Sequence, residues 1–166
     1  MDSQAVRDQS LEQLEGKSWG DPPADATRLV ATVYRLRQVP LGRLDVEGLR
    51  LLIGQHEGLD ALVPLAIERL ETDPLAEGDY YPGDLLAAVL AVPASHWQAH
   101  PQDHDRLAAV LDAVTDPRGT LREEAGFDVD EAAASFRATI AAEHMVAETG
   151  ARTVPGLGRV SRARRR

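Results

Sequence analysis

The sequence predicts an all-α fold, and three observations support this class. Aromatic residues make up only 4% of the 166 residues while 43% are hydrophobic, so the core must consist mainly of Leu, Val, Ile and Ala. Leu and Ala lose little conformational freedom in a helix. Apolar residues recur with the helical period, and no alternating segment of useful strand length occurs. We therefore predict one domain of about seven or eight helices over residues 1–150, followed by a mobile Arg-rich tail over residues 151–166.

The first expected helix is short. Ser10 is a suitable N-cap for a helix over Leu11–Glu15, because its hydroxyl can accept a hydrogen bond from a free backbone N–H group. Gly16 ends this helix. The turn that follows carries Trp19, which we expect to dock onto the main core.

A second helix is expected over residues 25–39. Asp25 is its expected N-cap, and Pro40 stops it because the residue before a proline avoids the helical region. The apolar positions of this segment follow the helical period and predict one stripe that faces the core. They are Leu29, Val30, Val33 and Leu36.

Two helices are expected in the centre of the chain. Asp45 caps the first, which Gly58 closes, and its core face is expected to carry Leu49, Leu52, Ile53 and His56. Gly54 inside this helix costs about 1 kcal/mol relative to Ala, so we expect it to let another helix approach closely. The second helix runs from about Leu59 to Thr72 and ends at an Asp-Pro pair.

The second half of the chain continues the helical pattern. Pro82 suits the first turn of a helix that Pro93 ends, and Ser95 is expected to cap a short turn with Trp97. Pro101 opens a further helix. Its core face is predicted to consist of Leu107, Val110, Leu111 and Val114. A last long helix is expected to begin at Asp128 or Asp130 and to end near Glu148.

Charge is distributed unevenly along the chain. The net charge is −9, but the last fifteen residues hold six arginines and no acidic residue. Without those six, 12 basic and 27 acidic residues remain, a net charge of −15 for the body. An acidic body suits a basic partner and disfavours direct binding to nucleic acid.

Residues 75–84 form an acidic segment with aromatic side chains. Three carboxylates, Glu77, Asp79 and Asp84, accompany Tyr80 and Tyr81, and no basic residue lies between Arg69 and Arg106. The segment is interpreted either as a solvated acidic face or as a recognition surface for a basic partner.

The sequence contains no motif that supports an enzyme or a metal site. His56 has no second histidine four positions later, and Pro101 is expected to break the register that would stack His96, His100 and His104 on one helix. No Gly-rich phosphate loop occurs. We therefore predict no catalytic residue, no metal ligand and no cofactor.

Composition also bears on the compartment. The chain has no cysteine, and neither a signal-peptide pattern nor a membrane-length apolar run is present. We expect a cytoplasmic protein without a membrane partner.

The central stretch resembles the immunity proteins of bacterial contact-dependent growth inhibition (CDI) systems. The resemblance is carried by LRLLIGQHEGL (49–59), by LVPLAIERLETDPLAEGDYYPGDLLAAVL (62–90) and by SHW (95–97). It extends over about residues 10–97, a little over half of the chain, and the Arg-rich tail lies outside it.

This resemblance implies an antidote that is not an enzyme. Such a protein binds the toxic C-terminal domain of its cognate effector in the cytoplasm and blocks the active site, and the toxins are commonly nucleases. A nuclease surface is basic because it holds phosphates, which agrees with the acidic body. We expect toxin contacts from Glu77, Asp79, Tyr80, Tyr81 and Asp84. The alternatives are a helical metal-dependent enzyme and a general protein-interaction adaptor.

Overall fold

The computed structural model describes residues 3–115, 129 and 131–138. Between residues 3 and 115 the chain forms eight α-helices and one 3₁₀-helix, and residues 131–138 are helical as well. In chain order the elements are α1 (Ser3–Arg7), α2 (Leu11–Glu15), α3 (Arg28–Leu36), η1 (Leu41–Arg43), α4 (Val46–Gly54), α5 (Leu59–Thr72), α6 (Asp84–Leu90), α7 (Ala94–Ala99) and α8 (Pro101–Val114). The described residues contain no β-strand, which confirms the predicted all-α class. The predicted tail and the end of the last helix lie outside the described residues.

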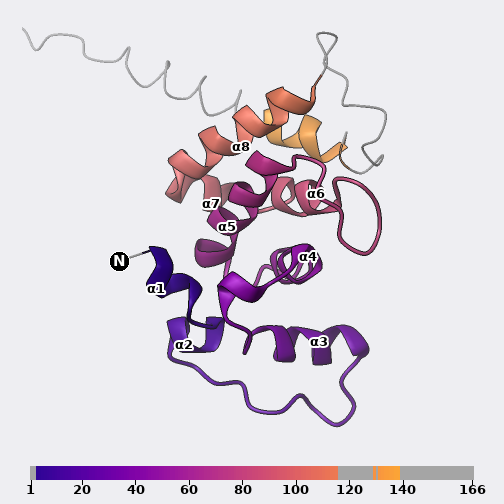
Figure 1. The fold of residues 1–166 in the computed structure, drawn as a ribbon. Helices are drawn as coiled ribbons and strands as arrows, with labels where there is room; N and C mark the ends of the chain where they lie inside the picture. The colour runs from indigo at the N-terminus through magenta and orange to yellow at the C-terminus, as the bar shows by residue number, and fades with distance from the viewer. Residues whose placement is uncertain (1–2, 116–128, 130, 139–166) are drawn as a thin grey trace, which may run out of the picture.

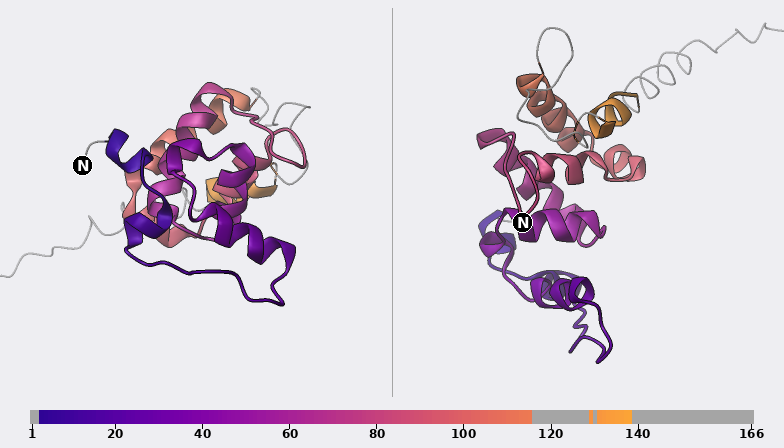
Figure 2. Two further views of the ribbon diagram at one scale, coloured as in Figure 1. Left: turned by 60° about the horizontal axis from the view of Figure 1, so that its bottom comes forward. Right: turned by 90° about the vertical axis from the view of Figure 1, so that its right-hand side faces the viewer.

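The helices are stacked from α3 at one end of the molecule to α8 at the other (Figure 1). Helix α4 follows α3 in the stack and packs on both α5 and α6, while α5 also packs on α8. Figure 2 shows the same order from a second direction, with α3 at the end of the stack. A long loop between α5 and α6 extends from one side of the stack.

The core lies between α4, α5, α6 and α8. Fully buried aliphatic side chains come from all four helices, and they include Leu52, Ile53, Leu62, Ile67, Leu70, Leu85, Leu86 and Leu107. Each such side chain contributes roughly 1.5–3 kcal/mol by leaving water. The predicted core face of α8 is confirmed, because Leu107, Val110, Leu111 and Val114 are all buried. Phe136 closes this end of the core, with its ring centroid 5.4 Å from that of Trp97.

Local sequence signals place several helix ends correctly. The Ser10 hydroxyl accepts a hydrogen bond from the Gln13 N–H at 3.4 Å, and the Gln13 side chain accepts one from the Ser10 N–H at 2.9 Å. Asp45 caps α4 by accepting from the Gly48 N–H at 2.7 Å. Helix α5 has the predicted bounds. These caps satisfy N–H groups that have no partner inside the helix.

Several predicted helix ends are wrong. Pro82 does not lie in the first turn of α6, because Gly83 is the N-cap and the helix begins at Asp84. Thr27, not Asp25, caps α3, because its hydroxyl reaches the Val30 N–H at 3.3 Å. Helix α4 ends at Gly54, so His56 leaves the core face; it is exposed, with a φ of 59°. Ser95 lies inside α7, and Pro93 precedes that helix.

Glycine has a different role from the predicted one in this region. Gly54 ends α4 in open space, with nothing within 4 Å of the position of a Cβ atom, so the predicted close approach is wrong. Gly58 does not close α4 but precedes α5, with a φ of 57°. A Cβ atom there would lie 2.3 Å from a methyl carbon of Leu11, so glycine allows α2 to dock against the start of α5.

A buried arginine joins the N-terminal segments. Arg37 is 1% exposed and forms ion pairs with Glu15 and Glu57. Its guanidinium carbon lies 4.0 Å from the ring centroid of Trp19. The prediction that Trp19 docks onto the core is confirmed, because its half-buried ring packs against core residues. This ring also contacts Tyr34 edge-on, with the two ring centroids 4.9 Å apart. We call Arg37, Glu15, Glu57 and Trp19 the Arg37 cluster.

Candidate functional site

Residues 77–84, here called the tyrosine loop, fold around the carboxylate of Asp84. This residue starts α6 and is 3% exposed. Its two carboxylate oxygens accept hydrogen bonds from the Gly78 N–H at 2.7 Å and from the Tyr80 N–H at 3.2 Å. Asp84 thus holds the loop backbone from the inside.

A second carboxylate, that of Glu47 on α4, holds the loop from the neighbouring helix. Glu47 accepts a hydrogen bond from the Asp79 N–H at 3.0 Å and two from Arg50, at 2.7 Å and 2.6 Å. The Arg50 hydrogen bonds lower the pKa of Glu47, and Glu47 in turn raises the pKa of Arg50. Arg50 Nε also lies 3.6 Å from Asp84 Oδ2. We call Arg50, Glu47, Asp84 and Tyr80 the Arg50 cluster.

Gly78 lets the loop backbone approach both carboxylates. A Cβ atom at this position would lie 2.6 Å from Glu47 Oε2 and 2.9 Å from Asp84 Oδ2. Real Cβ atoms do not come this close to oxygen, so a side chain here would displace one anchor of the loop. The sequence pattern Gly-Asp-Tyr-Tyr is therefore tied to a specific loop conformation.

The outer side of the tyrosine loop carries the exposed groups. Tyr80 is 70% exposed, and its ring lies 4.5 Å from the guanidinium carbon of Arg50. Glu77 and Asp79 are exposed, whereas Tyr81 is half-buried and packs against the core. Of the five residues expected to contact a toxin, four therefore reach the surface and Asp84 lies beneath it. Contact with a partner stays a prediction for all five.

The tyrosine loop forms one wall of a groove whose other walls are α3 and α4. The groove has a volume of about 720 Å³, and its lining includes Asp79, Tyr80, Leu29, Arg28, Arg35 and Arg50. Leu29 is 43% exposed, and its neighbour Val30 is exposed as well. The predicted core stripe of this helix is therefore wrong at two positions, because α3 lies at the end of the stack and buries only part of its surface.

Three arginines line this groove beside the acidic side chains. Arg50 reaches the loop from α4, while Arg28 and Arg35 come from α3. The absence of basic residues between Arg69 and Arg106 in the sequence therefore does not describe the charge around the folded loop. Glu47 and Arg50 were missed as parts of the site because they precede the loop by about thirty residues.

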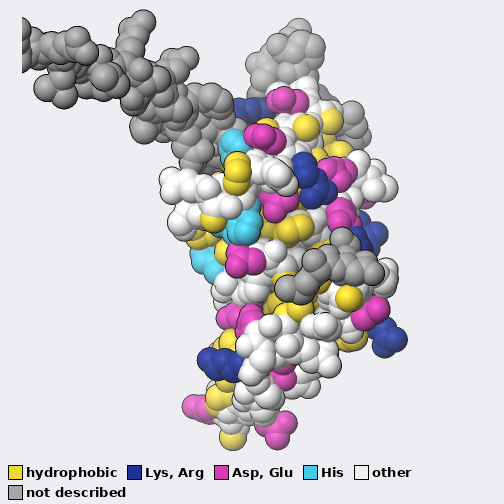
Figure 3. Space-filling model, turned by 90° about the vertical axis from the view of Figure 1, so that its left-hand side faces the viewer, with side chains coloured by type: hydrophobic (Ala, Val, Ile, Leu, Met, Phe, Trp, Pro, Cys, Tyr) yellow, Lys and Arg dark blue, Asp and Glu magenta, His cyan; other side chains and the backbone are white. Residues whose placement is uncertain are grey.

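His96, His100 and His104 form two groups by their contacts. Histidine side chains lie near one another on one face of the molecule, with acidic side chains beside them (Figure 3). His96 and His100 have ring centroids 4.5 Å apart and share the carboxylate of Asp60, whereas His104 packs beside Trp97 and Phe136. The His100 N–H donates to the His96 carbonyl at 3.0 Å, so the helical turn continues to His100. The expected break in register at Pro101 therefore separates only His104.

Burial affects the charge of His96. This side chain is buried, which lowers its pKa, and the neighbouring His100 lowers it further.

Asp60, His96 and His100 are the group of metal-ligating side chains that converges among the described residues. Asp60 was missed in the sequence because it lies 36 positions before His96.

Comparison with known proteins gives one family. A family model described as CDI immunity proteins matches residues 13–107, which is more than half of the chain and includes the tyrosine loop and both helices, α3 and α4, that line the groove. A search of curated proteins found no match.

Among the residues that the structure describes, no helix is both long enough and apolar enough to cross a membrane.

Proposed function

Because the chain belongs to the family of CDI immunity proteins, which inhibit toxins and are not enzymes, we propose that it neutralises its cognate toxin by covering the active site with the tyrosine loop. Binding of a cognate CDI toxin follows from the family. The proposal adds three points to the family assignment: the tyrosine loop contacts the toxin, this contact blocks the active site, and the toxin is a nuclease.

The observation that carries the proposal is a large aromatic side chain exposed on a loop with fixed geometry. Tyr80 is mostly exposed, yet its backbone N–H and that of Asp79 are hydrogen-bonded to Asp84 and Glu47. Tyrosines of this kind are common centres of binding energy in protein interfaces. A loop held in one conformation before binding loses less conformational entropy in the complex.

The groove extends this surface towards α3. Leu29 adds exposed apolar area in the same groove as the loop, while Arg28 and Arg35 add donors that can pair with carboxylates of a partner. An apolar centre with a polar rim is the usual composition of a specific interface. We infer that a toxin contacts both the loop and α3.

Charge supports a nuclease as the target. Glu77 and Asp79 project from the loop into solvent, and the body of the chain has a net charge of −15. A nuclease active site is basic because it binds phosphate groups, so these carboxylates can occupy the place of the phosphates. Complementary charges also accelerate association of the two proteins. Since such a toxin acts on nucleic acid inside the cell, we infer that the antidote works in the cytoplasm.

The test is a titration of the purified chain against the toxin domain encoded beside it, with cleavage of nucleic acid followed in parallel. We expect a one-to-one complex and loss of cleavage at one equivalent. A short, non-cleavable oligonucleotide should compete with the chain for the toxin, because both occupy the active site. Binding without such competition would place the chain elsewhere on the toxin. Absence of binding to a folded, active toxin would favour a general adaptor role.

A further inference from the structure

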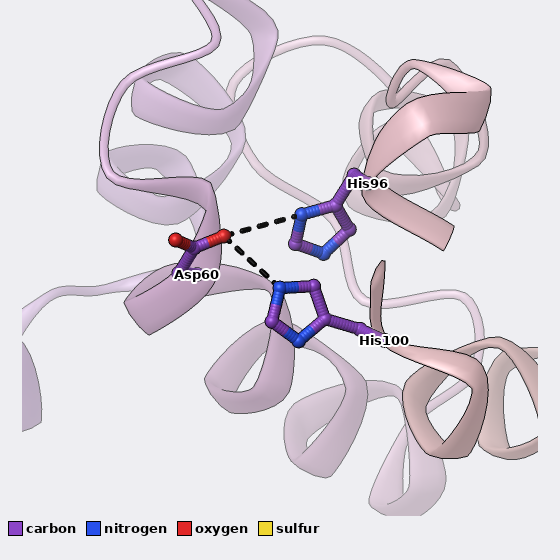
Figure 4. Close-up of side chains that lie close together, drawn as sticks. All are labelled: Asp60, His96 and His100. Atoms are coloured by element: carbon purple, nitrogen blue, oxygen red, sulfur yellow. Dashed lines mark hydrogen bonds and ion pairs between the residues drawn. The ribbon is translucent and has the colours of Figure 1, made fainter. Parts of the chain in front are cut away.

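We propose that Asp60, His96 and His100 bind a divalent transition-metal ion, for which Zn²⁺ is the natural probe. The three side chains come from two parts of the stack: Asp60 lies in the first turn of α5, His96 on α7, and His100 between α7 and α8. Figure 4 shows both imidazole rings directed at the same carboxylate oxygen of Asp60. This site is separate from the tyrosine loop and is independent of the proposed toxin contact.

The distances between the ligand atoms suit tetrahedral coordination. His96 Nδ1 lies 3.5 Å from Asp60 Oδ1, and His100 Nε2 lies 3.1 Å from the same oxygen. All three ligand atoms lie within 4.8 Å of one another. Zinc bonds to nitrogen and oxygen ligands of about 2.0–2.2 Å require neighbouring ligand atoms to lie about 3.4 Å apart. A small rotation of the side chains is therefore enough to place an ion between them.

Helix geometry explains why the two histidines converge. Residues four positions apart lie on one face of a helix, and the turn of α7 continues to His100 through the hydrogen bond from its N–H to the His96 carbonyl. Asp60 then faces this pair from the start of α5. The arrangement is thus set by backbone structure at all three positions, which lowers the entropic cost of gathering the ligands.

Exposure at the site allows an ion to enter. The Asp60 side chain is 85% exposed and that of His100 is half-buried, whereas His96 forms the buried floor. Water can therefore supply a fourth ligand. Two imidazole nitrogens and one carboxylate oxygen favour Zn²⁺ or Co²⁺ over Mg²⁺ and Ca²⁺, which prefer sites made of oxygen. Bound metal would join α5 to the α7–α8 corner.

The test uses the full-length chain without a histidine tag, freed of metal with a chelator. Calorimetric titration with Zn²⁺ is expected to show one site, and Co²⁺ is expected to give the strong visible absorption of a tetrahedral complex. A hundredfold excess of Zn²⁺ over its Kd should raise Tm by about 5–10 °C. The same concentration of Mg²⁺ should leave Tm unchanged.

Variants identify the ligands. Asp60→Asn and His100→Gln change exposed or half-buried side chains and should each weaken Zn²⁺ binding about tenfold or more, because even residues that only support metal ligands cost about 10–100-fold. His56→Asn is the matched control: His56 is exposed, lies outside the converging group, and has a positive φ that Asn tolerates. Its Kd should equal that of the wild type.

Two results would overturn the proposal. One is the absence of a zinc-dependent rise in Tm for the folded wild-type chain. The other is an equal Kd for the wild type, Asp60→Asn and His100→Gln, which would place the ion at other residues. Circular dichroism confirms that each variant is folded before its affinity is compared.

Discussion

The Arg37 cluster and the Arg50 cluster combine the same kinds of chemical group but lie at different positions in the molecule. Each places an arginine between two carboxylates with an aromatic ring against its guanidinium. In the Arg37 cluster the arginine is 1% exposed and the ring of Trp19 packs inward. In the Arg50 cluster the arginine is 20% exposed and the ring of Tyr80 faces solvent.

The difference lies in what each cluster holds. Among the described side-chain contacts, the carboxylates of Glu15 and Glu57 pair only with Arg37. The Arg37 cluster therefore forms a closed junction between α2, α3 and the segment after α4. The carboxylates of the Arg50 cluster also accept three N–H groups from the tyrosine loop. An arginine with two carboxylates and an aromatic ring therefore supports stability in one place and presents a surface in the other.

Disruption of the Arg37 cluster should lower the stability of the fold most. Arg37→Ala should lower the free energy of unfolding by about 3 kcal/mol, near the lower end for a broken buried ion pair, since Glu15 and Glu57 can still reach water. Arg37→Met keeps most of the packed volume and should cost less. Denaturant unfolding followed by circular dichroism measures both. Equal stability of wild type and Arg37→Ala would show that the cluster does not hold the fold together.

The next effect concerns the inner anchor of the tyrosine loop. Asp84→Ala removes the acceptor for two backbone N–H groups and the partner of Arg50, so it should cost about 2–3 kcal/mol of unfolding free energy. Toxin affinity should fall as well because the loop loses its fixed conformation. Asp79→Asn is the control, since this exposed side chain makes no such contact in the loop interior, and its unfolding midpoint should match that of the wild type.

A smaller effect is the pH dependence of the outer anchor. Arg50 lowers the pKa of Glu47 in the folded chain, so the contribution of Glu47 to stability is complete above the unfolded value of 4.5 and is lost as pH falls through the folded pKa. Glu47→Gln should therefore be less stable than the wild type at pH 7, by about 1 kcal/mol or less. This difference should shrink below pH 4.5. A gap that widens on acidification would contradict the assigned role.

Tyr80 should have the smallest effect on stability. Tyr80→Ala removes an exposed ring whose main contact is with Arg50, so the unfolding free energy should change by about 0.5 kcal/mol or less. Toxin affinity should fall by about tenfold or more, which is typical when a central interface aromatic is removed. The opposite pattern, a large loss of stability with unchanged toxin affinity, would show that Tyr80 stabilises the fold and does not contact the toxin.

The sequence predicts the parts of the fold that depend on neighbouring residues. The cap at Asp45, the bounds of α5 and the core face of α8 follow from turn chemistry and from the helical period, and the structure has all three. The cap of α3 is two residues later than predicted. Asp25 and Thr27 are both good caps, and local signals do not distinguish them.

Features that depend on distant residues could not be predicted in this way. Leu29 is exposed because α3 lies at the end of the stack (Figure 1). The helical period of the sequence does not indicate where a helix lies in the stack. The tyrosine loop was found through its composition, but its anchor Glu47 lies on another helix. Asp84 has the residue type of an interface carboxylate and is nevertheless buried. Only the fold separates these roles.

If the tyrosine loop covers the toxin, the exposed carboxylate of Asp79, held beside Tyr80 by the Arg50 cluster, faces the toxin surface. The most direct measurement compares toxin affinity for Asp79→Lys and Asp112→Lys, which make the same charge change at two exposed positions, one on the loop and one on α8. We expect Asp79→Lys to weaken binding by about tenfold or more and Asp112→Lys to bind like the wild type. Equal affinities of the two folded variants would contradict it.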